Sequence, residues 1–165
     1  MPTKKFKVCL LGNFGVGKTS LVARYVRNTF SDKYLTTVGV KVDTRQVSLG
    51  DDEHTLVIWD VEGSDSVSPL QAAYLRGANG LLLVADGTRE HTLQAALGLL
   101  DELREERPDL PAVIAINKLD LLSQWQIRID DLRSLSAAAP VVCTSALDAS
   151  NVESAFHELT RLMVA

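Results

Sequence analysis

The chain has 165 residues, 46% of them hydrophobic, and a formal net charge of −4. This length and composition fit one domain with a real core and argue against a disordered chain. The acidic balance argues against a protein that binds nucleic acid through a general basic field. The two cysteines, Cys9 and Cys143, lie in short apolar runs and are expected to be buried free thiols. The three histidines, His54, His91 and His157, lack metal-ligand spacing and are expected at the surface.

Strand and helix patterns begin near the N-terminus. The apolar run at 6–11 predicts a buried strand, and the stretch at 18–28 places its apolar residues on one helical face. Residues 38–49 alternate between polar and apolar, which predicts a half-exposed strand. After a turn at 50–52, residues 54–60 are expected to return as the antiparallel partner of that strand.

The second half of the chain alternates strands with helices. Continuous apolar runs at 80–86, 112–117 and 141–146 predict strands that are covered on both faces. Apolar residues at helical spacing over 93–103 predict a helix after the first of these strands. The segment Ser150-Asn151-Val152-Glu153 fits a capping box that opens the last helix.

This alternation predicts an α/β fold with a mostly parallel six-stranded sheet, one antiparallel edge strand and helices on both faces. The chain has no internal repeat or linker, so we expect residues 1–165 to form a single domain. In such sheets, ligands bind beyond the carboxyl ends of the strands. Functional residues are therefore expected in the loops that follow the predicted strands.

The loop after the first predicted strand reads GNFGVGKT at 12–19 and fits G-x-x-x-x-G-K-[ST]. Glycines let backbone N–H groups converge on phosphate oxygens, and the following helix directs its N-terminal dipole at them. Lys18 is placed to reach the β and γ phosphates, and the Thr19 hydroxyl to bind Mg²⁺. A chance match in a glycine-containing turn is the alternative, but the strand before and the helix after favour a phosphate loop.

Two further polar loops follow later strands: Asn117-Lys118-Leu119-Asp120 and Thr144-Ser145-Ala146. Guanine presents two adjacent donors, N1–H and its amine, and one carboxylate accepts from both, so Asp120 is placed to select guanine. Adenine has an acceptor at the equivalent ring position, and a site built for a hydrogen bond rejects an analogue that lacks it. Alone, N-K-x-D also fits a polar helix-capping loop. Its position downstream of a phosphate loop favours the guanine interpretation.

Together these motifs resemble the Ras superfamily of small GTPases, and the Rab-like branch most closely. The resemblance spans essentially the whole chain and rests, in family order, on GNFGVGKT, YLTTVGV (34–40), WDVEG (59–63), YLRGANG (74–80), NKLD and TSA. It implies a P-loop GTPase fold, GTP or GDP as ligand and Mg²⁺ as cofactor. It also implies a switch in which loss of the γ phosphate releases segments near 31–40 and 61–76. Those segments would present the surface for an exchange factor, a GTPase-activating protein and effectors.

The family's site residues carry over by position. The implied nucleotide contacts are Asn13, Phe14, Gly15, Val16, Gly17, Lys18, Thr19, Ser20, Phe30, Tyr34, Thr37, Gly63, Asn117, Lys118, Asp120, Ser145, Ala146 and Leu147. The implied Mg²⁺ ligands are Thr19, Thr37 and Asp60, and the implied catalytic residues are Lys18, Thr37, Gly63 and Ser64. The Ala146 N–H is expected to face the guanine oxygen.

Several of these residues also have ordinary structural interpretations. Taken singly, Thr37 fits a residue entering a strand, Phe30 a core aromatic and Gly63 a turn glycine. Tyr34 either covers the phosphates or is a surface aromatic. The joint spacing of Thr37, Phe30 and Gly63 favours their functional roles, whereas both interpretations of Tyr34 stay open.

Four positions depart from the family pattern. Ser64 stands where members that hydrolyse GTP well have glutamine, which orients the attacking water. Phe14 and Glu62 stand near the γ phosphate where small residues are common, and Leu147 stands where lysine is frequent. We therefore expect slow intrinsic hydrolysis and an obstructed approach for an arginine finger.

Two other functions stay open. A scaffold that holds GTP or GDP with negligible hydrolysis is favoured by the three changes around the γ phosphate, whereas the retained Mg²⁺ ligands favour a switch. A small ATP-dependent kinase is disfavoured, because the sequence shows no arginine cluster for a lid and NKLD predicts guanine.

The sequence shows no intrinsic membrane anchor. It contains no run of about 18 apolar residues, no secretory signal and no myristoylation or prenylation motif. We expect a cytoplasmic protein, with a lipid-bearing C-terminal tail beyond this chain as the alternative.

Overall fold

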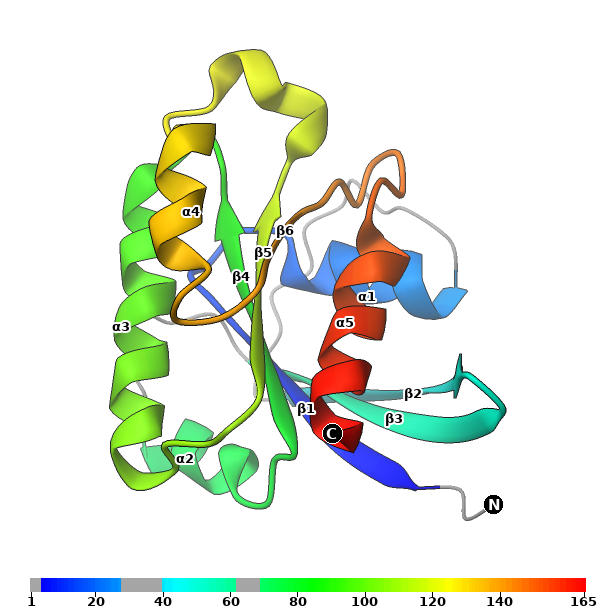
Figure 1. Cartoon of the computed structure of the whole chain (residues 1–165). Coiled ribbons are helices and arrows are strands. Elements are labelled where there is room, and N and C mark those ends of the chain that lie inside the picture. Colours follow the sequence, from blue (N-terminus) through cyan, green and yellow to red (C-terminus); the bar gives the residue numbers. More distant parts are fainter. Residues whose placement is uncertain (1–3, 28–39, 62–68) are drawn as a thin grey trace.

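The computed structural model describes residues 4–27, 40–61 and 69–165. These residues contain a six-stranded sheet in the order β2-β3-β1-β4-β5-β6 (Figure 1). The strands are β1 (Lys5–Leu11), β2 (Val40–Leu49), β3 (Asp52–Val61), β4 (Gly80–Asp86), β5 (Ala112–Asn117) and β6 (Val141–Cys143). Among the described strands, only β2 and β3 pair in antiparallel fashion, and β2 lies at the edge. The predicted α/β fold and its mostly parallel sheet are thus confirmed.

Helices cover both faces of this sheet (Figure 1). The described helices are α1 (Lys18–Arg27), α2 (Pro69–Leu75), α3 (Glu90–Glu106), α4 (Leu132–Leu135) and α5 (Val152–Val164), with short 3₁₀ turns η1 (Leu119–Gln124) and η2 (Ile129–Asp131). One core cluster packs α1 and α5 against the sheet, and the other packs α2, α3 and α4 against the opposite face.

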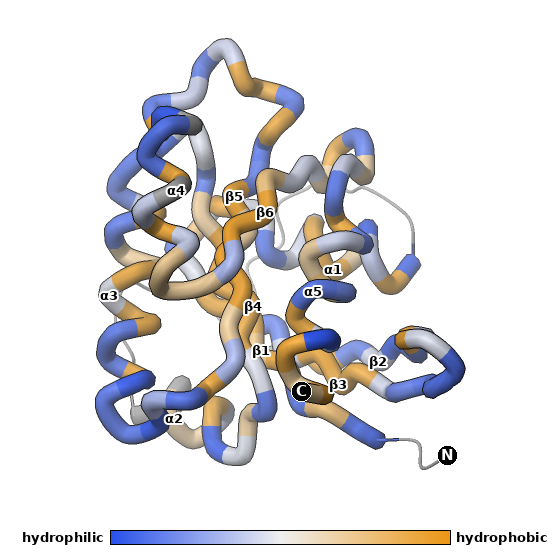
Figure 2. Tube along the Cα trace, viewed as in Figure 1, coloured by the Kyte–Doolittle hydropathy of each residue, from blue (hydrophilic) through white to orange (hydrophobic). Residues whose placement is uncertain are grey.

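The alternation of side chains along the strands produces this division. Val8 and Leu10 of β1 belong to the α1–α5 side, whereas Cys9 and Leu11 point to the α3 side. The central strands are buried on both faces, so they are apolar along their length, as the tube in Figure 2 shows for β4 and β5. On the α1–α5 side the rings of Tyr25 and Phe156 stack with their centroids 3.8 Å apart.

Three local predictions need correction. The turn between β2 and β3 contains only residues 50–51, because Asp52 already pairs with Leu49. The last strand ends at Cys143 rather than at residue 146. Two residues later, the N–H of Ser145 donates to the carbonyl of Ser150 instead of continuing the sheet. Both cysteines are free, but Cys143 is only half-buried.

The predicted capping box is also wrong. The residue before α5 is Asn151, which has a left-handed backbone (φ 59°) and makes no side-chain cap. Ser150 lies outside the helix and donates its N–H to Asp148. Glu153 instead forms an ion pair with Arg45 of β2, 2.7 Å apart. Within the described residues, no helix is both long and apolar enough to cross a lipid bilayer.

Candidate functional site

The predicted functional loops meet at one edge of the sheet, where β1, β4, β5 and β6 end (Figure 1). The loop after β1 leads into α1, which begins at Lys18. The ends of β3 and β5 place Asp60 and Asn117 next to it. The sequence therefore brings its phosphate-loop motif and its N-K-x-D motif together because parallel strands carry both.

Close packing explains two glycines of the phosphate loop. A Cβ at Gly12 would lie 2.3 Å from the carbonyl oxygen of Val84, and one at Gly17 would lie 2.4 Å from Nδ2 of Asn117. Gly17 also has a φ of +98°, which L side chains rarely adopt. Between them, Val16 is completely buried and fixes the loop to the core. The backbone of the loop thus packs closely against Val84 at Gly12 and against Asn117 at Gly17.

A buried carboxylate lies beside the start of α1. The Thr19 hydroxyl donates to Oδ2 of Asp60 over 2.7 Å, and Asp60 is 1% exposed. Burial raises the pKa of Asp60, against the opposing effects of the Thr19 hydrogen bond and the Lys18 charge. Its second oxygen, Oδ1, is buried and has no hydrogen-bond partner among the described residues.

This pair of residues fits Mg²⁺. Mg²⁺ prefers hard oxygen ligands and takes only one or two protein carboxylates when phosphates and water supply the rest. Thr19 and Asp60 provide a hydroxyl and an incompletely satisfied carboxylate at one point. Over the three described ranges, no group of three or more His, Cys, Asp or Glu residues gathers into a metal cluster.

One buried amide joins the phosphate loop to the other two loops. Asn117 is 2% exposed and donates from Nδ2 to the carbonyl of Val16 over 3.1 Å. Its Oδ1 accepts from the Thr144 hydroxyl at 3.2 Å and from the Ala146 N–H at 3.3 Å. The Ala146 amide, expected to face the base, thus contacts Asn117 in this structure.

The candidate guanine-reading carboxylate is held from the neighbouring loop. Asp120 is exposed, and its Oδ1 accepts a 2.7 Å hydrogen bond from the buried hydroxyl of Ser145. The N–H of Leu119 donates to the carbonyl of Thr144, which keeps the two loops side by side. Leu147 is half exposed. The Ser145 hydroxyl therefore orients the Asp120 carboxylate, which remains exposed to solvent.

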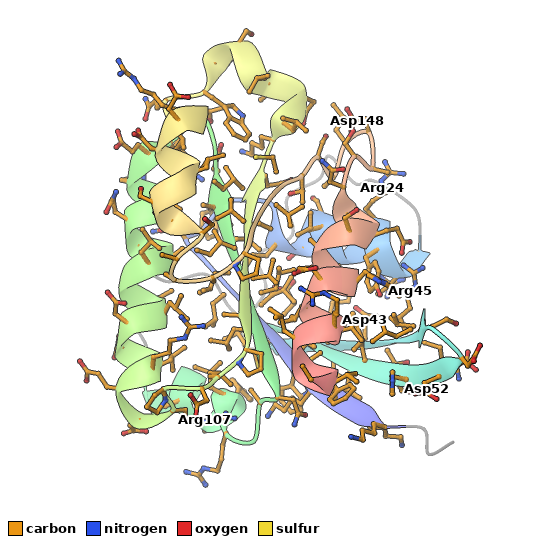
Figure 3. All side chains as sticks on the ribbon, in the orientation of Figure 1. Arg24, Asp43, Arg45, Asp52, Arg107 and Asp148 are labelled. Atoms are coloured by element: carbon orange, nitrogen blue, oxygen red, sulfur yellow. The ribbon has the colours of Figure 1, made fainter. Side chains whose placement is uncertain are left out.

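Arg24 lies outside every motif that the sequence offers. This side chain reaches from α1 and donates from Nε to the carbonyl of Ala146 and from Nη2 to that of Leu147, both at 2.8 Å. Figure 3 shows it beneath the loop that carries Asp148. Hydrogen bonds from Ser150 and Ser145 and the charge of Arg24 lower the pKa of Asp148. Only helical periodicity marks Arg24 in the sequence, and it does not reveal which loop the side chain reaches.

Asp86, at the end of β4, is a second residue that sequence reasoning missed. Its side chain is 1% exposed and accepts from Lys118 Nζ at 2.8 Å and from Arg89 Nε at 3.0 Å. The N–H and hydroxyl of Thr88 also donate to it. Burial acts to raise the pKa of Asp86, but the hydrogen bonds from Lys118, Thr88 and Arg89 outweigh it and lower the pKa.

The backbone around Lys118 is braced by an indole ring. Lys118 adopts a left-handed conformation (φ 73°), and its carbonyl accepts a 2.8 Å hydrogen bond from Nε1 of Trp125. The same indole lies close to Gly87, where an added Cβ would lie 2.1 Å from a ring atom. The loops after β4 and β5 therefore form one packed unit.

The remaining predicted residues divide into two groups. In the described part, Phe14 is 55% exposed and Lys18 is buried, with Ser20 in the first turn of α1. Phe30, Tyr34, Thr37, Gly63 and Ser64 lie outside the described residues, as do Glu62, residues 31–39 of the first predicted switch segment and residues 62–68 of the second. Their roles stay predictions.

Comparisons with known proteins agree with this geometry. The sequence model of the Ras family matches residues 7–165. The Ras-related protein RABA1c of Arabidopsis thaliana is 38% identical over 157 residues, covering 93% of this chain and 73% of its own length. The Ras-related protein Rab-31 of Rattus norvegicus is 34% identical, with 98% and 84% covered. Human Ras-related protein Rab-25 is 38% identical, with 94% and 75% covered.

Proposed function

Because the chain belongs to the Ras family of small GTPases and is Rab-like, we propose that it is a switch that binds GTP or GDP with Mg²⁺ and hydrolyses GTP slowly. The observation that carries this proposal is the buried amide of Asn117, which joins the phosphate loop to the loops around Asp120 and Ser145. A nucleotide that spans these loops would contact one connected unit.

Different residues would bind the phosphates and the base of the nucleotide. The backbone amides of the phosphate loop and Lys18 would hold the phosphates, which favour a helix N-terminus. Asp120, fixed by the Ser145 hydroxyl, would accept from the two donors of guanine. Adenine lacks that donor pair, so the site would reject ATP.

Thr19 and Asp60 would hold Mg²⁺, with Thr37 as a further ligand. The Oδ1 atom of Asp60, which is buried and has no hydrogen-bond partner in the described part of the chain, supports this assignment. When bound, Mg²⁺ neutralises phosphate charge and fixes the geometry of the transferring group. Thr37 and Gly63 would contact the γ phosphate only when it is present, and this difference would switch the affinity for regulators and effectors.

Slow hydrolysis follows from the groups around the γ phosphate. A serine hydroxyl at residue 64 is too short to orient the attacking water directly, as glutamine does in relatives. The exposed ring of Phe14 would occupy space that an arginine finger needs. The same changes favour the second candidate, a scaffold that binds nucleotide with negligible hydrolysis.

The bound nucleotide tests the central proposal. Nucleotide extracted from the purified protein should be GDP or GTP, identified by anion-exchange chromatography against standards. Recovery of ATP or ADP would overturn guanine recognition.

A single-turnover assay then separates the switch from the scaffold. The switch predicts slow, Mg²⁺-dependent release of phosphate from GTP, and the scaffold predicts none above the rate in solution. Ser64→Gln should raise the rate by about 10-fold or more, since a positioned water lowers the barrier by over 1 kcal/mol. An unchanged rate in Ser64→Gln would mean that Phe14 or Glu62 dominates, or that another group positions the water.

We propose that the protein works in the cytoplasm, where an exchange factor, a GTPase-activating protein and effectors would read its nucleotide state.

A further inference from the structure

Two cations contact successive carbonyl groups of the phosphate loop. Arg89 Nη2 donates to the carbonyl of Phe14 over 3.2 Å, and Lys118 Nζ donates to the carbonyl of Gly15 over 3.2 Å. Both cations also contact the same oxygen of Asp86, Arg89 at 3.0 Å and Lys118 at 2.8 Å. The buried carboxylate therefore holds two side chains, from different loops, against neighbouring peptide groups.

Peptide geometry links these contacts to the phosphates. In a trans peptide, the C=O of one residue and the N–H of the next lie in one plane and point in opposite directions. A cation that fixes the Phe14 carbonyl therefore fixes the N–H of Gly15, and one that fixes the Gly15 carbonyl fixes that of Val16. These amides belong to the set whose donors converge on phosphate oxygens in a loop of this sequence pattern.

We propose that Arg89 is a positioning residue for the nucleotide phosphates, which aims the Gly15 N–H by holding the Phe14 carbonyl and slows nucleotide release. This inference rests on the proposed function and deepens it. Lys118 belongs to the N-K-x-D motif, whereas nothing in the sequence motifs assigns Arg89 a role. The positive charge of Arg89 also polarises the peptide group between Phe14 and Gly15 that it contacts.

The setting of Arg89 differs from that of an ordinary surface ion pair. Asp86 is 1% exposed and Arg89 is 36% exposed, so their attraction is screened less than that of a pair on the surface. Arg161 offers a matched contrast, because it pairs with Glu158 at the same spacing of three residues. That pair is exposed on α5, with side chains 57% and 30% accessible. Arg161→Ala therefore removes the same charge and the same kind of pair away from the site.

The test measures release of a fluorescent GDP analogue and the ³¹P NMR spectrum of bound GDP. Arg89→Ala should release GDP about tenfold faster, as expected for one charge-assisted hydrogen bond that is partly exposed. It should also shift the β-phosphorus resonance of the GDP that stays bound. Arg89→Lys keeps the positive charge and a donor group. Both changes should therefore be smaller in Arg89→Lys than in Arg89→Ala. Arg161→Ala should change neither.

Each outcome has one meaning. Unchanged release and an unchanged β-phosphorus resonance in folded Arg89→Ala would overturn the inference. Faster release and a lower melting temperature, with the resonance unmoved, would also overturn it, because they indicate general loosening. If Arg89→Ala does not fold, Arg89→Gln carries the same measurements. Failure of the unaltered protein to retain GDP would instead overturn the proposed function, and the inference with it.

Discussion

Asp120 illustrates how one side chain is made both accessible and rigid. It lies at the surface, yet the buried hydroxyl of Ser145 fixes its carboxylate. A free surface aspartate would lose conformational entropy on binding a base, and this hydrogen bond reduces that loss.

Asp120→Ala should therefore weaken GDP binding by roughly 10²- to 10⁴-fold, as expected from the loss of two charge-assisted hydrogen bonds. Titration calorimetry or competition with a fluorescent nucleotide measures the change. Asp130→Ala, at an exposed position of η2, removes the same charge and should bind as the unaltered protein does. Equal affinities in the two variants would refute guanine recognition by Asp120.

His54 is buried rather than at the surface as expected. It is 3% exposed, lies against the ring of Phe6 at 5.5 Å, and neither ring nitrogen has a hydrogen-bond partner among the described residues. Alternation along β3 places it on the same face as Leu56 and Ile58. The period-two pattern could have revealed this burial, whereas the residue type alone suggested solvent.

His54→Phe should raise the free energy of unfolding by about 1 kcal/mol, because it removes buried polar atoms that lack partners. Urea denaturation monitored by circular dichroism measures this. His91→Phe, at an exposed position of α3, is the control and should change stability by less than about 0.5 kcal/mol. Destabilisation by His54→Phe would mean that the pocket is too small for the larger ring.

At the scale of elements, α1 contacts both ends of the predicted nucleotide site. Its first turn carries Lys18 and Thr19, and Arg24 lies less than two turns later and holds the carbonyls of Ala146 and Leu147. The helix therefore connects the phosphate half of the site with the base half.

Arg24→Ala should loosen the loop after β6 and release GDP about tenfold faster, since two hydrogen bonds from a charged group are lost. Hydrogen exchange should increase at the amides of residues 145–147. Arg27 lies on the same helix and pairs with Asp43. Arg27→Ala should therefore leave both measurements unchanged. If hydrogen exchange at residues 145–147 is no faster in Arg24→Ala than in the unaltered protein, other contacts hold the loop.

The sequence predicted elements whose signal is local and missed contacts that form across the chain. The phosphate loop and N-K-x-D were recognisable because their residues are contiguous and the strands before them are continuous apolar runs. The end of the last strand and the capping box were wrong because hydrogen bonds within the loop, from the Ser145 N–H to Ser150 and from the Ser150 N–H to Asp148, set its path. Arg24 and Arg89 could not be found, since their partners lie 122 and 75 residues away.

At the scale of the whole molecule, Asp86 ends β4 in the middle of the sheet and contacts the loops after β4 and β5, and its two cationic partners reach the phosphate loop. A buried carboxylate with two cationic partners also contributes to folding. Because its pKa is lower in the folded protein, this contribution is present above the unfolded value of about 4 and is lost as the pH falls through the folded value.

Asp86→Asn should destabilise the protein by about 1–3 kcal/mol at pH 7, a value reduced from that of fully buried pairs because both cations are about one-third exposed. The difference from the unaltered protein should shrink as the pH is lowered below about 4. Chemical denaturation across this pH range measures it. Asp101→Asn, at an exposed position of α3, should show no such pH dependence, and a constant difference for Asp86→Asn would contradict the argument.

The indole of Trp125, pressed on Gly87 and bonded to the Lys118 carbonyl, gives this protein an intrinsic optical reporter. The sequence contains one other tryptophan, Trp59, in β3. In Trp59→Phe, all tryptophan fluorescence would come from Trp125, beside the N-K-x-D loop. Loading and emptying of the pocket could then be followed in real time without a chemical label on either the nucleotide or the chain.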